Sequence, residues 1–140
     1  MAQLDPQQVL DAYIAAVYAK DVEAFVDLYD EQVSVFDMWG EWTYQGVEAW
    51  RGMVTGWFGS LGNERVRVEM QDVQTVLTDQ LALIHATVTY SGLSAEGVQL
   101  RSMQNRLTLV CQPKNGGWKI IHEHSSAPAD LTTSKVILQR

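Results

Sequence analysis

The chain has 140 residues, of which 46% are hydrophobic and 19% are charged. This composition is typical of one folded domain spanning residues 1–140, and it excludes a chain that is disordered throughout. With 17 acidic and 10 basic side chains the net charge is −7, which disfavours binding to a nucleic acid. No apolar run approaches the roughly 20 residues that a membrane span needs, so we expect no membrane partner.

Two features bear on the compartment and on metal binding. Residues 1–8 contain neither the basic nor the apolar region of a secretory signal. Cys111 is the only cysteine, so an internal disulfide and a multi-cysteine metal site are excluded. We therefore expect a cytoplasmic protein, or one of another reducing compartment, without a metal.

Three helices are expected in the first half of the chain. Asp5 followed by Pro6 is a typical helix start, and apolar side chains recur at helical spacing over residues 9–18. Asp21 is suited to cap a second, shorter helix. Helical spacing returns over residues 47–58, after a loop.

Strands dominate the second half, where polar and apolar side chains alternate and the phase slips near Asp72, which indicates a bulge. Helices followed by strands predict an α+β fold, in which three N-terminal helices cover a strongly bent antiparallel sheet. Such a cone has one open mouth and encloses a pocket suited to a small molecule. Strands are expected at residues 33–37, 42–44, 66–77, 81–91, 98–111 and 118–126.

Three segments carry a family resemblance. Residues 33–37, 44–49 and 117–128 are similar to SnoaL-like proteins of the nuclear-transport-factor-2-like superfamily. The last segment also resembles the association domain of calmodulin-dependent kinase II. The resemblance covers nearly the whole chain and implies the cone fold. It does not fix an activity, because this superfamily includes isomerases, dehydratases, cyclases and non-enzymatic hubs.

Resemblance to ketosteroid isomerase implies two catalytic residues, with Asp37 as general base and Tyr13 as donor to an oxyanion. Asp37 could instead only end its strand, and Tyr13 could be a core residue. The family's third group, a protonated aspartic acid, has no counterpart between Val98 and Cys111, which argues against steroid isomerisation. His85 is a third catalytic candidate, beside Asp37, or a structural residue.

The aromatic residues suggest how a ligand is held. Four of the five tryptophans lie within 19 residues. Trp39 and Trp42 fall in the loop expected at the mouth, where they could form a lid, a ligand platform or a dimer contact. Trp50 and Trp57 are seven apart on one helix face, as core residues or pocket wall. Tyr90 is a further ligand-binding candidate.

Alternation along the last strand separates two roles. His122 and His124 share one face, and two histidines alone do not complete a metal site. In the resembling family the outer face of this strand meets the partner subunit, so the resemblance implies a dimer-interface role for both histidines. Glu123 and Ser125 share the other face and are expected in the pocket. A phase error of one residue would reverse this assignment.

Arg106 is expected to point into the cone as a ligand-binding residue, because the calmodulin-kinase relatives that this chain resembles hold arginines there. Three interpretations of its role stay open. It could anchor a ligand carboxylate inside the cone, pair with Glu123, or face solvent. The leading prediction is a cofactor-free isomerase, cyclase or dehydratase that acts on a small hydrophobic or carboxylate-bearing molecule, as a homodimer. The alternative is a non-catalytic ligand-binding or oligomerisation module.

Overall fold

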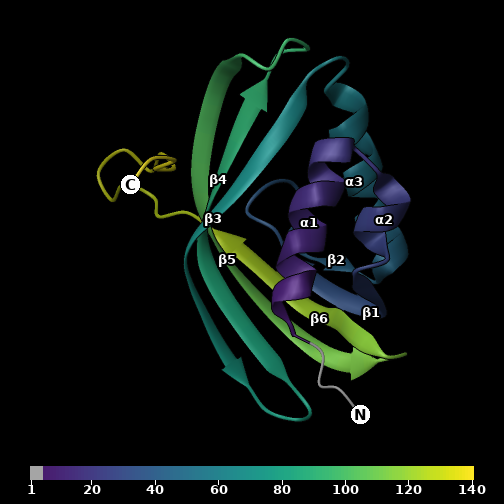
Figure 1. Cartoon of the computed structure of the whole chain (residues 1–140). Coiled ribbons are helices and arrows are strands. Elements are labelled where there is room, and N and C mark those ends of the chain that lie inside the picture. Colours follow the sequence, from purple (N-terminus) through teal and green to yellow (C-terminus); the bar gives the residue numbers. More distant parts are fainter. Residues whose placement is uncertain (1–4) are drawn as a thin grey trace.

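The computed structural model describes residues 5–140 (Figure 1). Residues 1–4 belong to the segment in which no secretory signal is expected, and they lie outside the described residues. Within residues 5–140, no helix has the length and apolarity needed to cross a bilayer. The elements are α1 (Gln7–Ala19), α2 (Val22–Val26), β1 (Tyr29–Phe36), β2 (Tyr44–Gln45), α3 (Val47–Ser60), β3 (Arg65–Leu77), β4 (Ala82–Leu93), β5 (Gln99–Lys114) and β6 (Gly117–Ser126).

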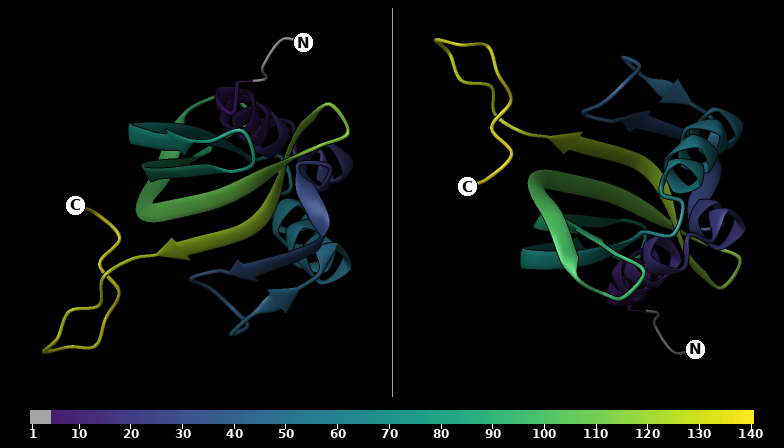
Figure 2. Two further views of the ribbon diagram at one scale, coloured as in Figure 1. Left: turned by 90° about the horizontal axis from the view of Figure 1, so that it is seen from below. Right: turned by 90° about the horizontal axis from the view of Figure 1, so that it is seen from above.

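The six strands form one strongly curled, unclosed sheet in the order β2-β1-β6-β5-β4-β3 (Figures 1 and 2). The three helices lie together on its concave side, which confirms the predicted α+β cone. Neighbouring strands are antiparallel except β1 and β6, which pair in parallel. A parallel pair needs a long crossover, and here α3 and the β3–β5 meander provide it.

Both aspartates expected at helix starts accept a backbone hydrogen bond there, although the N-cap of α1 is Pro6 and only Asp21 is the N-cap of its own helix. The Asp5 carboxylate accepts a hydrogen bond from the backbone N–H of Gln7 at 2.9 Å, and that of Asp21 accepts from Ala24 at 3.0 Å. Each bond satisfies an N–H that has no partner within its helix. Lys20 then ends α1 in the left-handed conformation, with φ 55°, which turns the chain into α2.

Two of the register shifts in the sheet bear on its bend and on which side chains face inward. The register of β3 against β4 shifts between Gln71 and Gln74, and Asp72 has φ 55°, which confirms the predicted bulge. A second shift, between Val110 and Cys111 of β5, leaves Ile121 of β6 without an opposing residue. A bulge sharpens the bend of its strand. Here it also makes Ile120, rather than Ile121, the buried residue.

The core lies between the helices and the concave face of the sheet. Phe25 of α2 is fully buried at its centre, where its ring contacts those of Tyr13, Tyr29, Trp57 and Phe58 at centroid distances of 4.9 to 6.3 Å. Large aromatic side chains bury much apolar surface. This cluster therefore fixes α1, α2 and α3 relative to β1.

Candidate functional site

A cavity of about 640 Å³ opens on the concave side of the sheet, between α1, α3 and strands β3 to β6. Most of its wall is aromatic or apolar, as is usual for a small-molecule site. Eight of the residues proposed from the sequence line this cavity: Tyr13, Asp37, Trp39, Trp50, Trp57, Tyr90, Glu123 and Ser125.

Asp37 is the half-buried carboxyl group at the end of β1. Its Oδ1 accepts a hydrogen bond from the hydroxyl of Ser125 at 3.0 Å, and its Oδ2 accepts from the N–H of Trp39 at 3.2 Å. Burial raises the pKa of Asp37 above its usual value, although these hydrogen bonds act in the opposite direction. A carboxylate that is held in place and partly desolvated is suited to accept a proton.

Glu123 is a second carboxyl group of the cavity, 2% exposed, on β6. Its Oε1 accepts a hydrogen bond from the Tyr29 hydroxyl at 2.6 Å. Burial raises the pKa of Glu123 to about 8, and the charge of Asp37 adds to the rise against the opposing hydrogen bond from Tyr29. Glu123 is therefore protonated at neutral pH, and the two carboxyl groups differ in burial and in their hydrogen-bond donors.

Two tyrosines face each other across the cavity wall. The hydroxyl oxygens of Tyr13 on α1 and Tyr90 on β4 are 2.9 Å apart. Burial raises the pKa of both phenols, so both keep their hydrogens at neutral pH. Only one hydrogen is needed for the bond between them, so the other hydroxyl hydrogen can be donated to a ligand oxygen.

Three proposed residues lie outside the cavity. The inward direction expected for Arg106 is wrong, because its side chain is exposed and its Nε donates to the Ser126 hydroxyl at 3.1 Å. The place of His85 beside Asp37 is also wrong, since His85 is exposed between buried neighbours on β4. Trp42 is 97% exposed and does not line the cavity.

Alternation along β5 explains both Arg106 and a residue that the sequence analysis missed. Leu107, Leu109 and Cys111 are buried, so every second residue faces inward and Arg106 falls in the outward phase. The same phase carried back from Leu107 brings Asn105 into the cavity wall. The alternating apolar residues from Leu107 to Cys111 were the feature of the sequence that could have identified Asn105 as a lining residue. Other lining residues not proposed from the sequence include Tyr44, Met53, Arg101, Met103 and Leu138.

His122 and His124 lie on the convex face of β6, opposite to Glu123 and Ser125. His124 is exposed. His122 is half-buried, and its Nδ1 lies 2.8 Å from the backbone oxygen of Ser34. The phase expected for this part of β6 is therefore confirmed.

A family model described as a SnoaL-like domain matches residues 7–130. The chain belongs to the SnoaL-like family. The comparison with curated proteins found no match.

Solved structures show that this SnoaL-like chain has the nuclear-transport-factor-2-like fold. A protein of that fold and of unknown function from Pseudomonas putida is 22% identical, with a TM-score of 0.85 over 96% of this chain and 92% of that one. A protein described as a calcium/calmodulin-dependent kinase II association domain, from Xanthomonas campestris, is 20% identical, with a TM-score of 0.74 over 93% and 95%. One described as an aromatic ring hydroxylase, from Novosphingobium aromaticivorans, is 19% identical, with 0.69 over 85% and 83%.

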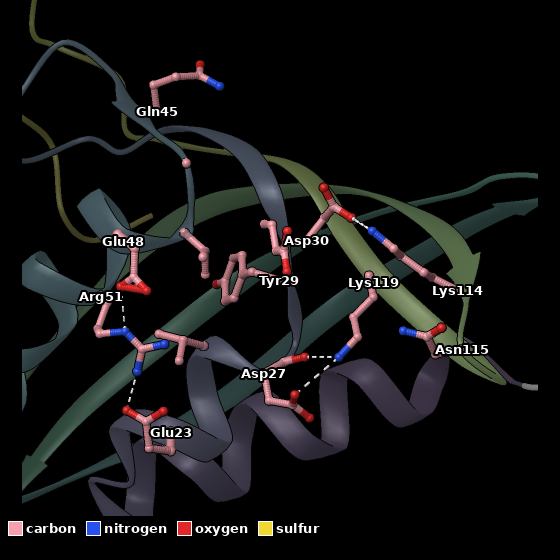
Figure 3. Close-up of a pocket in the computed structure, with 14 residues that line it drawn as sticks. Glu23, Asp27, Tyr29, Asp30, Gln45, Glu48, Arg51, Lys114, Asn115 and Lys119 are labelled. Atoms are coloured by element: carbon pink, nitrogen blue, oxygen red, sulfur yellow. Dashed lines mark hydrogen bonds and ion pairs between the residues drawn. The ribbon is translucent and has the colours of Figure 1, made fainter.

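A second hollow of this SnoaL-like protein, of about 600 Å³, lies at the surface between α2, α3, β1 and the turn after β5 (Figure 3). Its wall is charged, and each of its basic side chains is already in an ion pair. Such exposed pairs contribute little to stability and leave no unpaired cation for a ligand. Nor does any group of His, Cys, Asp and Glu within residues 5–140 have the arrangement to hold a metal. The pairs are Arg51–Glu23, Arg51–Glu48, Lys114–Asp30 and Lys119–Asp27.

Proposed function

We propose that this SnoaL-like protein is a cofactor-free isomerase, cyclase or dehydratase of a small hydrophobic molecule, with Asp37 as its general base. The observation that carries the proposal is the Asp37 carboxylate, held by Ser125 in an aromatic cavity that the Tyr13–Tyr90 pair also lines. In this arrangement a proton acceptor and a hydroxyl donor line one largely apolar cavity.

The chemistry assigned to these groups is removal of a proton next to a carbonyl. The C–H bond breaks, its proton passes to Asp37, and its electron pair forms an enolate. The hydroxyl hydrogen left over by the Tyr13–Tyr90 pair stabilises the enolate oxygen. Return of the proton to another carbon completes an isomerisation. Ser125 is a positioning residue, because it acts through its hydrogen bond to Asp37.

The ligand of this reaction is expected to be hydrophobic. The expectation of a carboxylate-bearing ligand depended on Arg106 pointing into the cavity, but this side chain faces outward. The aromatic wall suits a flat, apolar molecule. The name of the Novosphingobium protein, which refers to an aromatic ring, is in keeping with this class.

Deuterium exchange of an enolisable ketone tests the assignment. With 2-tetralone in D₂O, wild type is expected to accelerate exchange next to the carbonyl, as followed by NMR. Asp37→Asn removes the base and should lower the accelerated rate by about 10²–10⁴-fold. His85→Ala is the matched control, because this side chain faces outward, and it should exchange as wild type does. Equal rates in Asp37→Asn and wild type would contradict the assignment.

The alternative function is a non-catalytic ligand-binding or oligomerisation module. It is favoured by the similarity to the Xanthomonas protein described as an association domain. Light scattering separates the two, because a ring of many subunits that does not accelerate exchange supports the module. A small oligomer that accelerates exchange supports the enzyme.

A further inference from the structure

We propose that the cavity selects an uncharged ligand bearing a hydroxyl or N–H group, and that the side-chain oxygen of Asn105 accepts a hydrogen bond from this group. The inference rests on the proposed function, since it concerns the same cavity, and it names the class of ligand. It also makes Asn105 a residue that determines specificity.

Asn105 is unusual among the polar residues of the cavity wall. It is 7% exposed and lies on β5, where its Nδ2 donates to the sulfur of Met38 at 3.5 Å. Its Oδ1 is buried and has no hydrogen-bond partner within residues 5–140. Buried polar atoms nearly always have a partner, and leaving one without costs free energy. An acceptor in the wall of a cavity is therefore matched by a donor on the ligand.

The surroundings of Asn105 explain why the protein itself does not supply the donor. The side chain of Met103, the next inward residue on β5, has no N–H or O–H group, and neither does that of Val88, which is opposite on β4. The Tyr13 and Tyr90 hydroxyls are bonded to each other. Burial raises the pKa of Tyr90, and the Asn105 amide opposes this rise as a hydrogen-bond donor, so Tyr90 faces the N–H side of the amide rather than Oδ1. Rotation about the Cβ–Cγ bond of asparagine is soft, so the amide can turn its oxygen toward a bound molecule.

Nε1 of Trp50 is the other buried side-chain atom without a hydrogen bond in the described part of the chain. Burial raises the pKa of Tyr29, and the Trp50 N–H opposes this rise, which places the indole toward the Tyr29 hydroxyl. Trp50 therefore points at a protein group rather than at a ligand, and we assign no ligand contact to its Nε1.

The charges of the cavity exclude an anion at the buried end. Its acidic side chains are those of Asp37 and of Glu123, and Glu123 is neutral at neutral pH, so neither attracts an anion. Among its described lining residues Arg101 is the only arginine or lysine, and this side chain is 60% exposed and ion-paired with Glu64. A buried ligand carboxylate would meet Asp37 without a counter-ion, which is strongly unfavourable. The ligand group that reaches Asn105 is therefore neutral.

Three naphthalene probes separate these requirements. 2-Naphthol has an aromatic body and a hydroxyl donor, 2-methoxynaphthalene lacks the donor, and 2-naphthoate is an anion. By isothermal titration calorimetry, wild type is expected to bind 2-naphthol about tenfold more tightly than the methyl ether, as one buried hydrogen bond provides. The ether is the more apolar molecule, so apolar burial alone would reverse this order. Binding of 2-naphthoate should be weaker than that of both.

Two substitutions on β5 attribute the preference. Asn105→Leu replaces the amide with an apolar side chain of similar size, and it should remove the preference for 2-naphthol. Arg106→Ala changes the neighbouring residue, which faces outward, and should keep the preference. If Asn105→Leu does not fold, the comparison of the three probes on wild type still tests the proposal.

Several results would overturn the inference. If Asn105→Leu still preferred 2-naphthol over the methyl ether, the inference would be wrong. If Asp37→Asn lost this preference, Asp37 rather than Asn105 would accept the hydrogen bond from the naphthol hydroxyl. Binding of 2-naphthoate as tightly as 2-naphthol would contradict the uncharged class. Equal binding of naphthol and ether would refute this inference alone. Binding of none of the probes, together with absence of tetralone exchange, would refute the proposed function as well.

Discussion

Glu123 is the carboxyl group that the fold removes most completely from water. It lies on β6 in the inward phase and has one hydrogen bond, from Tyr29, with Asp37 as its nearest charged group in the cavity. Burial disfavours a negative charge at Glu123 and the charge of Asp37 adds to this, so the opposing hydrogen bond from Tyr29 does not suffice and the group stays protonated at neutral pH. The protonation state of Glu123 therefore ties the stability of the fold to pH.

We predict that wild type loses stability as the pH rises from about 5 to 8, in part through Glu123. The pKa of Glu123 is about 8 in the folded protein and near 4.3 when unfolded. The stabilisation that Glu123 contributes is therefore fully present below its pKa in the unfolded chain. It is lost as the pH rises through its pKa in the folded protein. By pH 7 the loss is on the order of 3 kcal/mol.

Urea denaturation at several pH values measures this effect. Glu123→Gln keeps a neutral acceptor for Tyr29, so its free energy of unfolding should vary less between pH 5 and 8. Glu48→Gln, an exposed glutamate on α3, is the control and should follow wild type. Equal slopes for Glu123→Gln and wild type would mean that Glu123 is ionised in the folded protein.

At the scale of elements, local rules predicted a helix cap and a bulge, and the resemblance implied the cone. The Asp21 cap and the bulge near Asp72 follow from neighbouring residues, whereas the inward direction of Glu123 was implied by the resemblance. Arg106 was assigned inward from the resemblance, whereas alternation from Leu107 places it outward. The bulge at Ile121 has no local signal, because it depends on how β6 aligns with β5. Sequence patterns alone do not reveal such long-range pairing.

The tail after β6 contributes to the site although its sequence contains few core residues. Figure 2 shows it standing away from the helices. Strand β6 ends at Ser126, and the tail then covers the edge of β5. The N–H of Gln104 donates to the backbone oxygen of Leu138 at 2.7 Å, and the Gln139 amide donates to that of Ser102 at 2.8 Å. Covering this edge also places Leu138 against the cavity.

We predict that Leu138→Ala weakens binding of 2-naphthol about fivefold, because it removes apolar wall from the cavity. Leu131→Ala is the matched control, since Leu131 is in the same tail but 99% exposed. Calorimetric titration of both variants measures the difference. Unchanged affinity in Leu138→Ala would show that the tail does not close the site.

At the scale of the molecule, the convex face of the sheet is the surface expected in a homodimer. Phe36 is 41% exposed there, and its ring contacts those of His122 and His124 at centroid distances of 4.8 and 5.6 Å. Leu83 of β4 adds a side chain that is 37% exposed. Apolar and aromatic groups gathered on one side of a sheet are typical of a surface that a partner covers.

We predict that this convex face forms a two-fold interface that buries roughly 800 Å² per subunit, the size of a standard stable contact. In a two-fold contact each substitution acts twice, so Phe36→Glu would place a charge in both halves of the interface and should yield monomers at micromolar concentration. Size-exclusion chromatography with light scattering measures this change. Trp42→Ala also removes an exposed aromatic group, but from outside this face, so it should remain dimeric. A wild type that is monomeric at micromolar concentration would disprove the interface, and a Phe36→Glu variant that stays dimeric would place the contact elsewhere.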